Sequence, residues 1–499
     1  MNSKKVILIM TDTQRTDMLG CYGNSDMNTP NIDKLATDGM LFKKAYTTQP
    51  VCGPARSALF TGTYPHSNGS WGNNMPLGDN VKTIGQRLTD KGIHTAYIGK
   101  WHLDGSDYFG LGRCPKGWDE NYWYDMRCYL EELSKEDRLC SRSPKIMEDR
   151  ELSEDFTYGN RVSNRAIDFL SNTKDEDFLL VVSYDEPHDP CVCPEPYASM
   201  YKGYEFPKNK NVWDTLEEKP EHQKIWAGDS VNQDKDSLTI TADYFFGCNS
   251  YVDYEIGRVL CAIEENCPDA LVIYTSDHGD HMNSHCLYTK GATMYQENIN
   301  IPLIIKQKDM ISAKSICENV ASHIDIVPTI LDIFEQNIPK TIEGKSMINT
   351  LKDPSTKTNE EVFIEFSRYE IDHDGFGGFQ PIRCVFDGRY KLVINLLTTD
   401  ELYDLEKDSS EMNNLINCSD YTNIRNSLHN KLLDWMNDTR DPFRGYYWER
   451  RPWREDASPA TWDYTRMTRQ REELDYEPKQ LDYSTGLEIT DTVRIKPKL

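Results

Sequence analysis

Short apolar runs, separated by amphipathic segments, dominate the first two thirds of the chain. Five of these runs carry almost no charge except at their ends, which is typical of strands buried on both faces of a parallel sheet. They lie at residues 6–11, 94–100, 178–185, 270–277 and 302–306. Helical periodicity marks residues 31–40, 83–92 and 242–266. Strands that alternate with helices predict an α/β fold with a large, mostly parallel sheet.

The pattern changes near residue 355. Short apolar runs follow one another closely at residues 361–367, 382–395 and 401–408, and Asp387-Gly388 favours a hairpin turn. Residues 421–436 are expected to form a helix. We therefore expect a main α/β domain at 1–355 and a smaller domain of antiparallel sheet plus helix at 356–440. The aromatic and charged tail at 441–499 is expected to pack on the body.

The chain is strongly acidic. Its 499 residues include 56 Lys and Arg against 81 Asp and Glu, a net charge of −25, and 38% of them are hydrophobic. The hydrophobic content is that of an ordinary folded protein. The negative charge disfavours nucleic acid and anionic membranes as partners. If the substrate is an anion, its site must be a positive pocket within a negative protein.

No targeting or membrane segment is recognised. The first apolar run spans only residues 6–10, whereas a signal peptide needs about 7–15 such residues and a membrane helix about 18 or more. The fourteen cysteines are scattered and contain no CxxC pair. We therefore expect a cytoplasmic protein with mostly reduced thiols.

Candidate chemistry gathers at the ends of the predicted strands. Asp12, Lys100, Asp185 and Asp277 each end such a strand, and ligands of open α/β sheets bind beyond the carboxyl ends of the strands. Asp12 and Asp277, with His278, suit a divalent cation such as calcium, magnesium or manganese. Taken singly, each is also explained as a helix cap or a loop residue.

Several basic side chains are candidates for binding an anion. Lys100 and His102 are two residues apart and would share one face of an extended segment. His188 lies between two prolines, and such a rigid loop can hold a general acid. Lys290 and His285 carry little signal on their own. Surface lysines, loop histidines and an ordinary turn explain the same residues.

Cys52 is placed unusually for a structural cysteine. Pro54 suits the first turn of a helix that ends at Gly62, so Cys52 lies at the helix N-terminus and Arg56 lies one turn further. The free N–H groups and the helix dipole favour an anion or a thiolate there. Two interpretations stay open from this pattern: a reactive cysteine, or a buried packing cysteine beside a surface arginine.

The extended pattern CxPxRxxxxTGxYPHxxG, from Cys52 to Gly69, resembles the signature of the type I sulfatases in the alkaline phosphatase superfamily. Further similar motifs occur in the same order along most of the chain. They are "ILIMTDTQRTDMLGCYGN", "TPNIDKLATDGMLFKKAYTTQP", "GIHTAYIGKWHL", "EPHDP", "TSDHGD" with "HCLYTKG", and "ELYDLEKDSSEMNNL".

The resemblance implies an alkaline-phosphatase-like fold, with a catalytic α/β domain at 1–355, and a sulfuric ester hydrolase activity that releases inorganic sulfate. Cys52 would be oxidised by a maturation enzyme to formylglycine (3-oxoalanine), and its hydrate would attack sulfur and then expel sulfate. Asp12, Asp277 and His278, with residue 52, would hold the metal, for which calcium is the family's usual ion and magnesium or manganese are alternatives.

The remaining implied roles concern protons and charge. Arg56 and Lys100 would steady the hydrate, and His102 would take its proton when sulfate is released. His188, with Lys290, would contact the sulfate and protonate the leaving alcohol. The sequence departs from the family pattern at several positions. Thr13 occupies a position where the family often has a second acid. Many members have asparagine at the position of His278 and serine at that of Ala55. Around His285, the usual "GDHG" is replaced by "NSHC" (283–286).

The expected substrate is a sulfated saccharide, derived from a glycosaminoglycan or a mucin. Loops carry specificity on such scaffolds. The candidate substrate contacts are His285 and four residues of the glycine-rich segment 368–383: Arg368, Asp372, His373 and Arg383. Three alternatives stay open: a phosphonate monoester hydrolase or phosphodiesterase of the same superfamily, a catalytically silent anion-binding protein, and a hydrolase with a thiol nucleophile.

Overall fold

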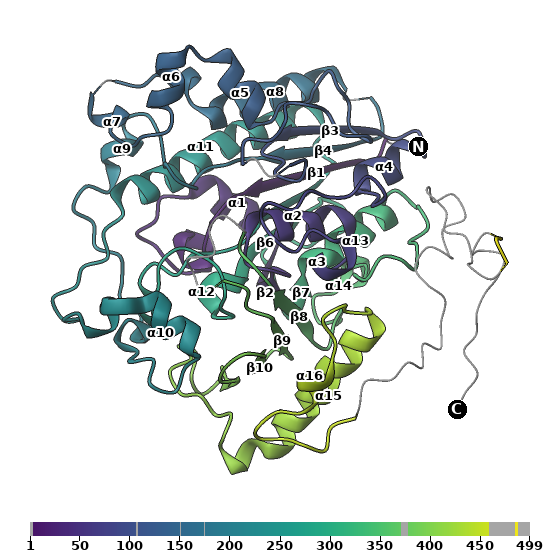
Figure 1. The fold of residues 1–499 in the computed structure, drawn as a ribbon. Helices are drawn as coiled ribbons and strands as arrows, with labels where there is room; N and C mark the ends of the chain where they lie inside the picture. The colour runs from purple at the N-terminus through teal and green to yellow at the C-terminus, as the bar shows by residue number, and fades with distance from the viewer. Residues whose placement is uncertain are drawn as a thin grey trace.

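Two sheets organise the computed structural model, which describes residues 3–105, 108–149, 151–173, 175–370, 378–458 and 485–487. Within these residues the larger sheet has seven strands in the order β3-β4-β1-β5-β6-β2-β7 (Figure 1). Its strands are β1 Lys5–Thr11, β2 Met40–Tyr46, β3 His94–Gly99, β4 Phe178–Ser183, β5 Leu271–Ser276, β6 Asn300–Lys306 and β7 Ser315–Ser322. Only β6 runs antiparallel to its neighbours, so the predicted mixed, mostly parallel sheet is confirmed.

The five predicted strands are all present, but β2 and β7 were not anticipated. The strand β2 carries two lysines in "MLFKKAY", and β7 is largely polar in "SICENVAS". Strand β7 lies at the edge of the sheet, where one side meets solvent and a long apolar run is not required. The first helix was expected to end at residue 40, and this was wrong. Helix α1 stops at Asp38 because Met40 already begins β2.

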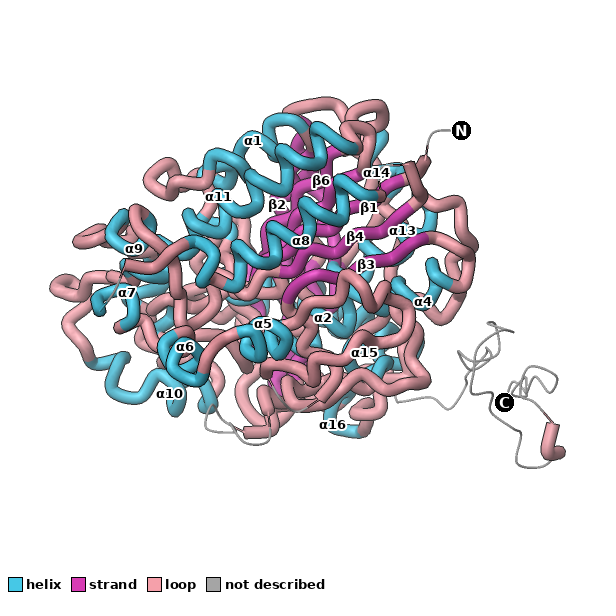
Figure 2. Tube along the Cα trace, turned by 90° about the horizontal axis from the view of Figure 1, so that it is seen from above, coloured by secondary structure: helices cyan, strands magenta, loops and turns pink. Residues whose placement is uncertain are grey.

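Helices cover both faces of this sheet, as Figure 2 shows from above. On one face lie α1 (Pro30–Asp38), α8 (Tyr158–Asn172) and α11 (Asp243–Asn266); on the other lie α2 (Cys52–Thr61), α4 (Ile84–Thr89) and α13 (Ile326–Ile333). The central strand β1 feeds both layers. Ile7 packs into the first and Val6 into the second, because successive side chains of a strand point to opposite faces.

Shorter helices join these elements. They are α3 Pro65–Asn68, α5 Met126–Glu132, α6 Lys135–Cys140, α7 Ile146–Asp149, α9 Tyr197–Met200, α10 Glu221–Ala227, α12 Gln296–Ile299 and α14 Ile348–Lys352. No helix in the described ranges is both long and apolar enough to cross a membrane. The fourteen cysteines all fall within the described segments, and every one is free.

The smaller sheet is antiparallel and follows α14. Its order is β11-β10-β9-β8, with β8 Val362–Phe366, β9 Ile382–Phe386, β10 Tyr390–Asn395 and β11 Glu401–Asp404. The predicted turn between β9 and β10 is confirmed, and Gly388 takes a positive φ of 96° there. Helix α15 (Thr422–Asp438) packs on this sheet. The domain boundary at 355/356 stays a prediction, and it falls between α14 and β8.

The first part of the tail packs on this smaller sheet. The helix α16 (Tyr446–Glu449) buries Trp448 almost completely, and Arg451 forms an ion pair with Asp400, the two atoms 2.8 Å apart. Of the later residues only 485–487 are described. The packing of the tail as a whole on the body stays a prediction.

A buried charge cluster joins the smaller sheet to the main body. His66 of α3 bonds to Glu365 of β8 through both its ring and its backbone N–H. Arg383 of β9 makes two bonds to Asp441, of 2.5 and 3.1 Å, and lies 3.8 Å from Glu365. His66, Glu365 and Asp441 form a group that could hold a metal ion, but the guanidinium already supplies the positive charge. Arg383 is 0% exposed, so the structure gives it a structural place and not the expected substrate contact.

Removing Arg383 should therefore destabilise the fold. Breaking a buried ion pair by deleting one partner typically costs about 3–5 kcal/mol, because the other charge stays buried and uncompensated. We expect Arg383→Ala to lower the midpoint of thermal unfolding strongly, as measured by calorimetry. Lys357→Ala, which removes one partner of an exposed pair with Glu360, should change stability by less than about 1 kcal/mol. Equal midpoints for the two variants would contradict a structural role for Arg383.

Candidate active site

Cys52 begins α2, as the position of Pro54 predicted. The helix ends at Gly62, whose φ of 70° lets its N–H donate to the carbonyl of Ala58 at 2.9 Å. The thiol is 1% exposed and is surrounded by polar side chains. Its Sγ lies 3.2 Å from His278 Nε2, 3.2 Å from Lys290 Nζ and 3.6 Å from Asp12 Oδ1. The contacts of Cys52 are therefore not those of a packing cysteine.

The sheet brings the predicted strand-end residues together. The register aligns Thr11 of β1 with Ser276 of β5, so the next residues, Asp12 and Asp277, leave the sheet side by side. Thr13 ties them together: its hydroxyl donates to Asp12 Oδ1 at 2.7 Å and its backbone N–H to Asp277 Oδ1 at 3.1 Å. Thr13 thus bonds to both carboxylates from the position where the family often has a second acid.

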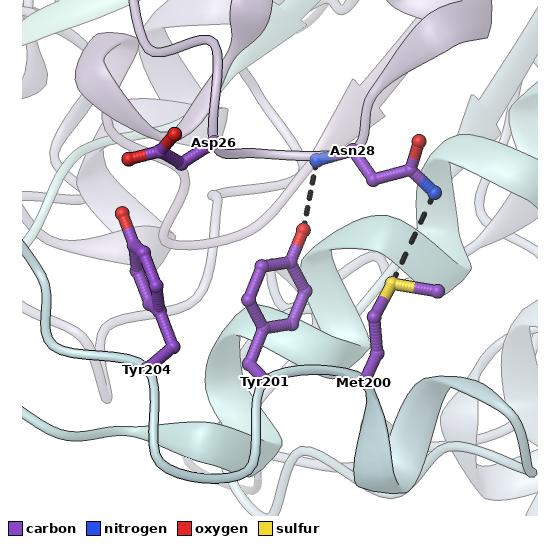
Figure 3. A pocket seen from close by; sticks show the side chains of 5 residues that line it. All are labelled: Asp26, Asn28, Met200, Tyr201 and Tyr204. Atoms are coloured by element: carbon purple, nitrogen blue, oxygen red, sulfur yellow. Dashed lines mark hydrogen bonds between the residues drawn. The ribbon is translucent and has the colours of Figure 1, made fainter.

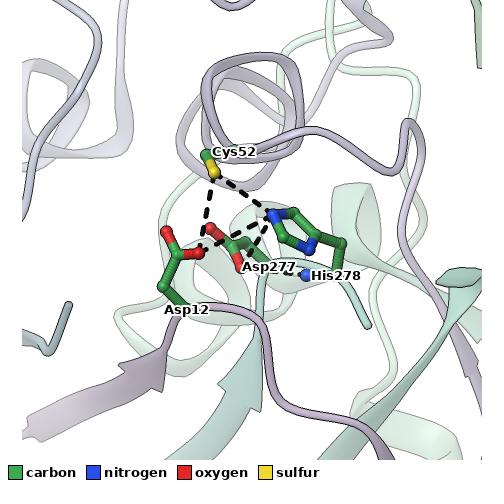
Figure 4. A group of neighbouring side chains, drawn as sticks. All are labelled: Asp12, Cys52, Asp277 and His278. Atoms are coloured by element: carbon green, nitrogen blue, oxygen red, sulfur yellow. Dashed lines mark hydrogen bonds and ion pairs between the residues drawn. The ribbon is translucent and has the colours of Figure 1, made fainter. Parts of the chain in front are cut away.

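Four side chains form a group suited to a metal ion. Asp12, Cys52, Asp277 and His278 point toward one another from β1, α2 and the loop after β5 (Figure 4). Each offers one ligand atom, and these atoms all lie within 4.8 Å of one another. All four residues are buried. The sequence predicted this set, and the structure brings its members together.

The donor chemistry of this group fits a divalent cation. Burial and the neighbouring Asp12 raise the pKa of Asp277 to about 7, because two carboxylates lie close together where little water can screen their repulsion. Burial lowers the pKa of His278, so its imidazole is neutral, as a metal ligand requires. A cation among these atoms would relieve the repulsion between the carboxylates. Carboxylate oxygens favour calcium, magnesium or manganese.

Two buried cations bind the Oδ2 atoms of these carboxylates: Arg56 contacts both Asp12 and Asp277, and Lys100 contacts Asp12. Arg56 Nη2 lies 3.1 Å from Asp12 Oδ2 and Arg56 Nε lies 3.1 Å from Asp277 Oδ2. Lys100 Nζ lies 2.8 Å from Asp12 Oδ2 and 2.9 Å from Asp185 Oδ1. Burial by itself would raise the pKa of Asp12, but Lys100 and the other neighbouring positive groups lower it well below its usual value. Arg56, Lys100 and Lys290 thus bring three positive side chains to this group, beside the carboxylates of Asp12, Asp185 and Asp277.

The remaining basic candidates also face Cys52. Burial and Asp12 raise the pKa of the Cys52 thiol, but Lys290, Lys100 and His188 outweigh them, and the pKa is lowered. Burial and the charges of Lys100 and Arg56 lower the pKa of His102 well below its usual value, so this ring is a neutral base. His188 is half-buried and lies in the loop after β4, where its Nδ1 is 3.2 Å from the hydroxyl of Tyr108.

Two tyrosines at the site were missed from the sequence. The hydroxyl of Tyr108 donates to Asp185 Oδ1 at 2.5 Å, and Lys100 Nζ lies 4.1 Å from the centre of its ring. Burial raises the pKa of Tyr369, and Lys290 and Cys52 are the charges that act on it most strongly. Both tyrosines lie in loops, where an aromatic residue gives no pattern. Only the proximity of Tyr369 to Arg368 in the glycine-rich segment hinted at this region.

The described residues that were expected to contact substrate have partners different from those of the predicted catalytic and metal-binding residues. His285 is 0% exposed. Its Nδ1 lies 2.7 Å from Asp214 Oδ2, and its ring stacks on that of Tyr295 with the ring centres 3.5 Å apart. Its burial gives no support for direct substrate contact, and that role stays a prediction. Arg368 is half-buried, with its guanidinium 6.0 Å from the ring centre of Phe379. Asp372 and His373 lie outside the described residues.

A separate hollow of about 670 Å³ opens elsewhere on the surface. Tyr201 and Tyr204 rise toward Asp26 and Asn28, and Met200 closes one side (Figure 3). The hydroxyl of Tyr201 accepts from the backbone N–H of Asn28 at 2.8 Å. None of these five residues belongs to the group around Cys52, so this hollow is distinct from the candidate active site.

Family models and a relative match the chain over most of its length. The family model described as Sulfatase matches residues 4–336, and one described as N-sulphoglucosamine sulphohydrolase, C-terminal, matches residues 283–438. The chain is 44% identical to "Uncharacterized sulfatase YidJ" of Escherichia coli strain K12, over 100% of this chain and 99% of that protein.

Solved structures share the fold. The structure of BT4656 in complex with its substrate D-glucosamine-2-N,6-O-disulfate has a TM-score of 0.72 and 21% identity, covering 89% of this chain and 99% of that one. The phosphonate monoester hydrolase of Agrobacterium radiobacter has a TM-score of 0.72 and 23% identity, covering 87% and 96%. With an alkaline-phosphatase-like architecture and a family match over most of its length, the chain belongs to the sulfatase family of the alkaline phosphatase superfamily and is a sulfuric ester hydrolase.

Proposed function

We propose that the enzyme releases inorganic sulfate from a sulfated saccharide. It would use a formylglycine derived from Cys52 and a divalent metal, for which calcium is the first candidate. The observation that carries this proposal is the placement of Cys52. It lies at the N-terminus of α2, within 3.6 Å of groups from β1, the loop after β5 and Lys290. An anion at this position lies at the positive end of the α2 dipole and near three positive side chains, Lys290, Lys100 and Arg56.

When present, the formylglycine supplies a hydroxyl nucleophile at position 52, and the metal adds positive charge beside it. The metal would be held by Asp12, Asp277 and His278, with residue 52. Arg56 positions both carboxylates through its two bonds of 3.1 Å. Arg56 also donates to the backbone carbonyl of Lys100 at 2.7 Å, which fixes the strand end that carries the lysine.

Proton transfer falls to His102 and His188. His102 is neutral and buried, so it can accept a proton from a group at position 52. His188 is more exposed, which suits donation to the oxygen of a departing alcohol. Lys290 Nζ, 3.2 Å from Sγ, places a charge where sulfate oxygens would lie. Tyr108 connects His188 to Lys100, because its hydroxyl lies 3.2 Å from His188 Nδ1 and 2.9 Å from Lys100 Nζ.

A saccharide substrate is supported by relatives and by the walls of the site. The similarly folded BT4656 binds a disulfated glucosamine, and the matching C-terminal model is described for an N-sulphoglucosamine sulphohydrolase. A side chain at Gly291, beside Lys290, would meet Trp226 at 3.3 Å and Tyr369 at 3.9 Å. Aromatic faces next to the reactive group suit a sugar ring, whose C–H faces pack on them.

Phosphonate monoester hydrolysis is the alternative. It is supported by the structural likeness to the Agrobacterium radiobacter enzyme and by a metal-binding group suited to either anion. The pair Lys100 and His102, which resembles a sulfatase clamp, favours the sulfate ester. The two activities are separated by testing both ester classes on one preparation.

Sulfate release should depend on Cys52. With protein co-expressed with a formylglycine-generating maturase, we expect sulfate from sulfated mono- and disaccharides, measured by ion chromatography. The Cys52→Ala variant should lose at least about a thousand-fold in kcat/KM, because it cannot form the nucleophile. Cys261→Ala, at an exposed cysteine, is the matched control and should keep full activity. Cleavage of phosphonate esters without any sulfate release would favour the alternative.

Metal binding should be visible without activity. Added calcium should raise the unfolding midpoint of metal-stripped protein by a few degrees, because a ligand that binds only the folded state stabilises it. Asp277→Asn removes one ligand and should abolish most of this shift, whereas Asp309→Asn, at an exposed carboxylate, should keep it. An equal calcium shift in both variants would place the ion elsewhere.

A further inference from the structure

An arginine with no part in the core chemistry lies beside the site. Arg142 is exposed, in the turn that follows α6. The central carbon of its guanidinium lies 5.0 Å from the ring centre of Phe109 and 5.9 Å from that of Tyr108. Its side-chain N–H groups have no hydrogen-bond or ion-pair partner among the described residues. Stacking on the rings holds the guanidinium while leaving its donors available.

Tyr108 links this arginine to the reacting groups. The other contacts of its ring are Lys100 Nζ at 4.1 Å and the rings of His102 and His188 at 5.2 and 5.3 Å. Arg142 is therefore separated from the histidines around Cys52 by a single side chain. Because His188 is the proposed donor to the leaving alcohol and contacts the same ring, Arg142 lies near the group that would meet that alcohol.

Charge also ties Arg142 to the site. Burial raises the pKa of Asp185, while Lys100, His188 and Arg142 lower it, and the net pKa is below its usual value. In a chain of net charge −25, the exposed guanidinium of Arg142 faces aromatic rings. It adds a cation close to Lys100, whose Nζ contacts the same ring of Tyr108.

We propose that Arg142, stacked on Tyr108 and Phe109, is an outer anion subsite that binds a second negative group of the substrate, a sulfate or a carboxylate. This inference rests on the proposed sulfatase function and narrows the substrate class to saccharides with two anionic groups. One sulfate ester lies at residue 52 and is cleaved; the other group stays on the leaving alcohol. The guanidinium can bind either oxyanion with two parallel N–H bonds.

The test compares substrates that differ by one charge. The mature enzyme is assayed with 3- and 4-carboxyphenyl sulfate and their methyl esters, and with N-acetylglucosamine 6-sulfate and glucosamine 2-N,6-O-disulfate. We expect a preference in kcat/KM for the doubly charged member of a pair, expressed in KM. Arg142→Ala should reduce that preference about ten-fold, and Arg142→Lys should recover part of it. Lys145→Ala removes an exposed cation three residues away and should leave the preference unchanged.

Binding provides a second measurement that needs no turnover. The same pairs are titrated into the Cys52→Ala protein by calorimetry, with and without Arg142→Ala. A ten-fold loss of the preference for the doubly charged ligand supports the subsite. The proposal is overturned if Arg142→Ala weakens both members of a pair equally, or neither. Failure of the sulfatase function would appear differently, as no Cys52-dependent sulfate release from any substrate.

Discussion

The structure depends on charge balance around two buried carboxylates. Asp12 and Asp277 are 0% exposed, and an unpaired buried charge costs several kcal/mol. Arg56 binds both carboxylates, Lys100 binds Asp12, and Thr13 donates to both. Burial and the charge of Asp12 nevertheless raise the pKa of Asp277. The remaining repulsion between the two carboxylates favours a further cation at this group.

The fold provides this balance from segments far apart in the sequence. Parallel strands β1, β3, β4 and β5 end at one edge, so Asp12, Lys100, Asp185 and Asp277 need no long side-chain reach to meet. The helix α2 then presents its N-terminus to the same edge. The smaller sheet is anchored through Glu365 and Arg383 and places Tyr369 near Lys290.

Much of this was predictable because each element carried a local signal. Continuous apolar runs marked the central strands, and Pro54 with Gly62 marked both ends of α2. Asp12, Asp277 and His278 followed from the strand ends, and residue 52 was added by the resemblance to the sulfatase signature. The polar edge strand β7 and the loop tyrosines Tyr108 and Tyr369 carried no such signal, because only tertiary contacts give them their places. Arg383 was misjudged for the same reason: a glycine-rich neighbourhood suggested a surface loop, while β9 buries the side chain against Asp441.

The most direct test of the account is to measure, on one preparation, the fraction of Cys52 converted to an aldehyde and the rate of sulfate release. Mass spectrometry of the peptide that contains residue 52 gives the fraction, and varying the amount of co-expressed maturase varies it. The account predicts that the rate rises in proportion to the aldehyde and vanishes when only thiol is present. Full sulfate release from protein whose Cys52 is entirely thiol would contradict it and would favour the thiol itself, which lies 3.2 Å from His278, as the nucleophile.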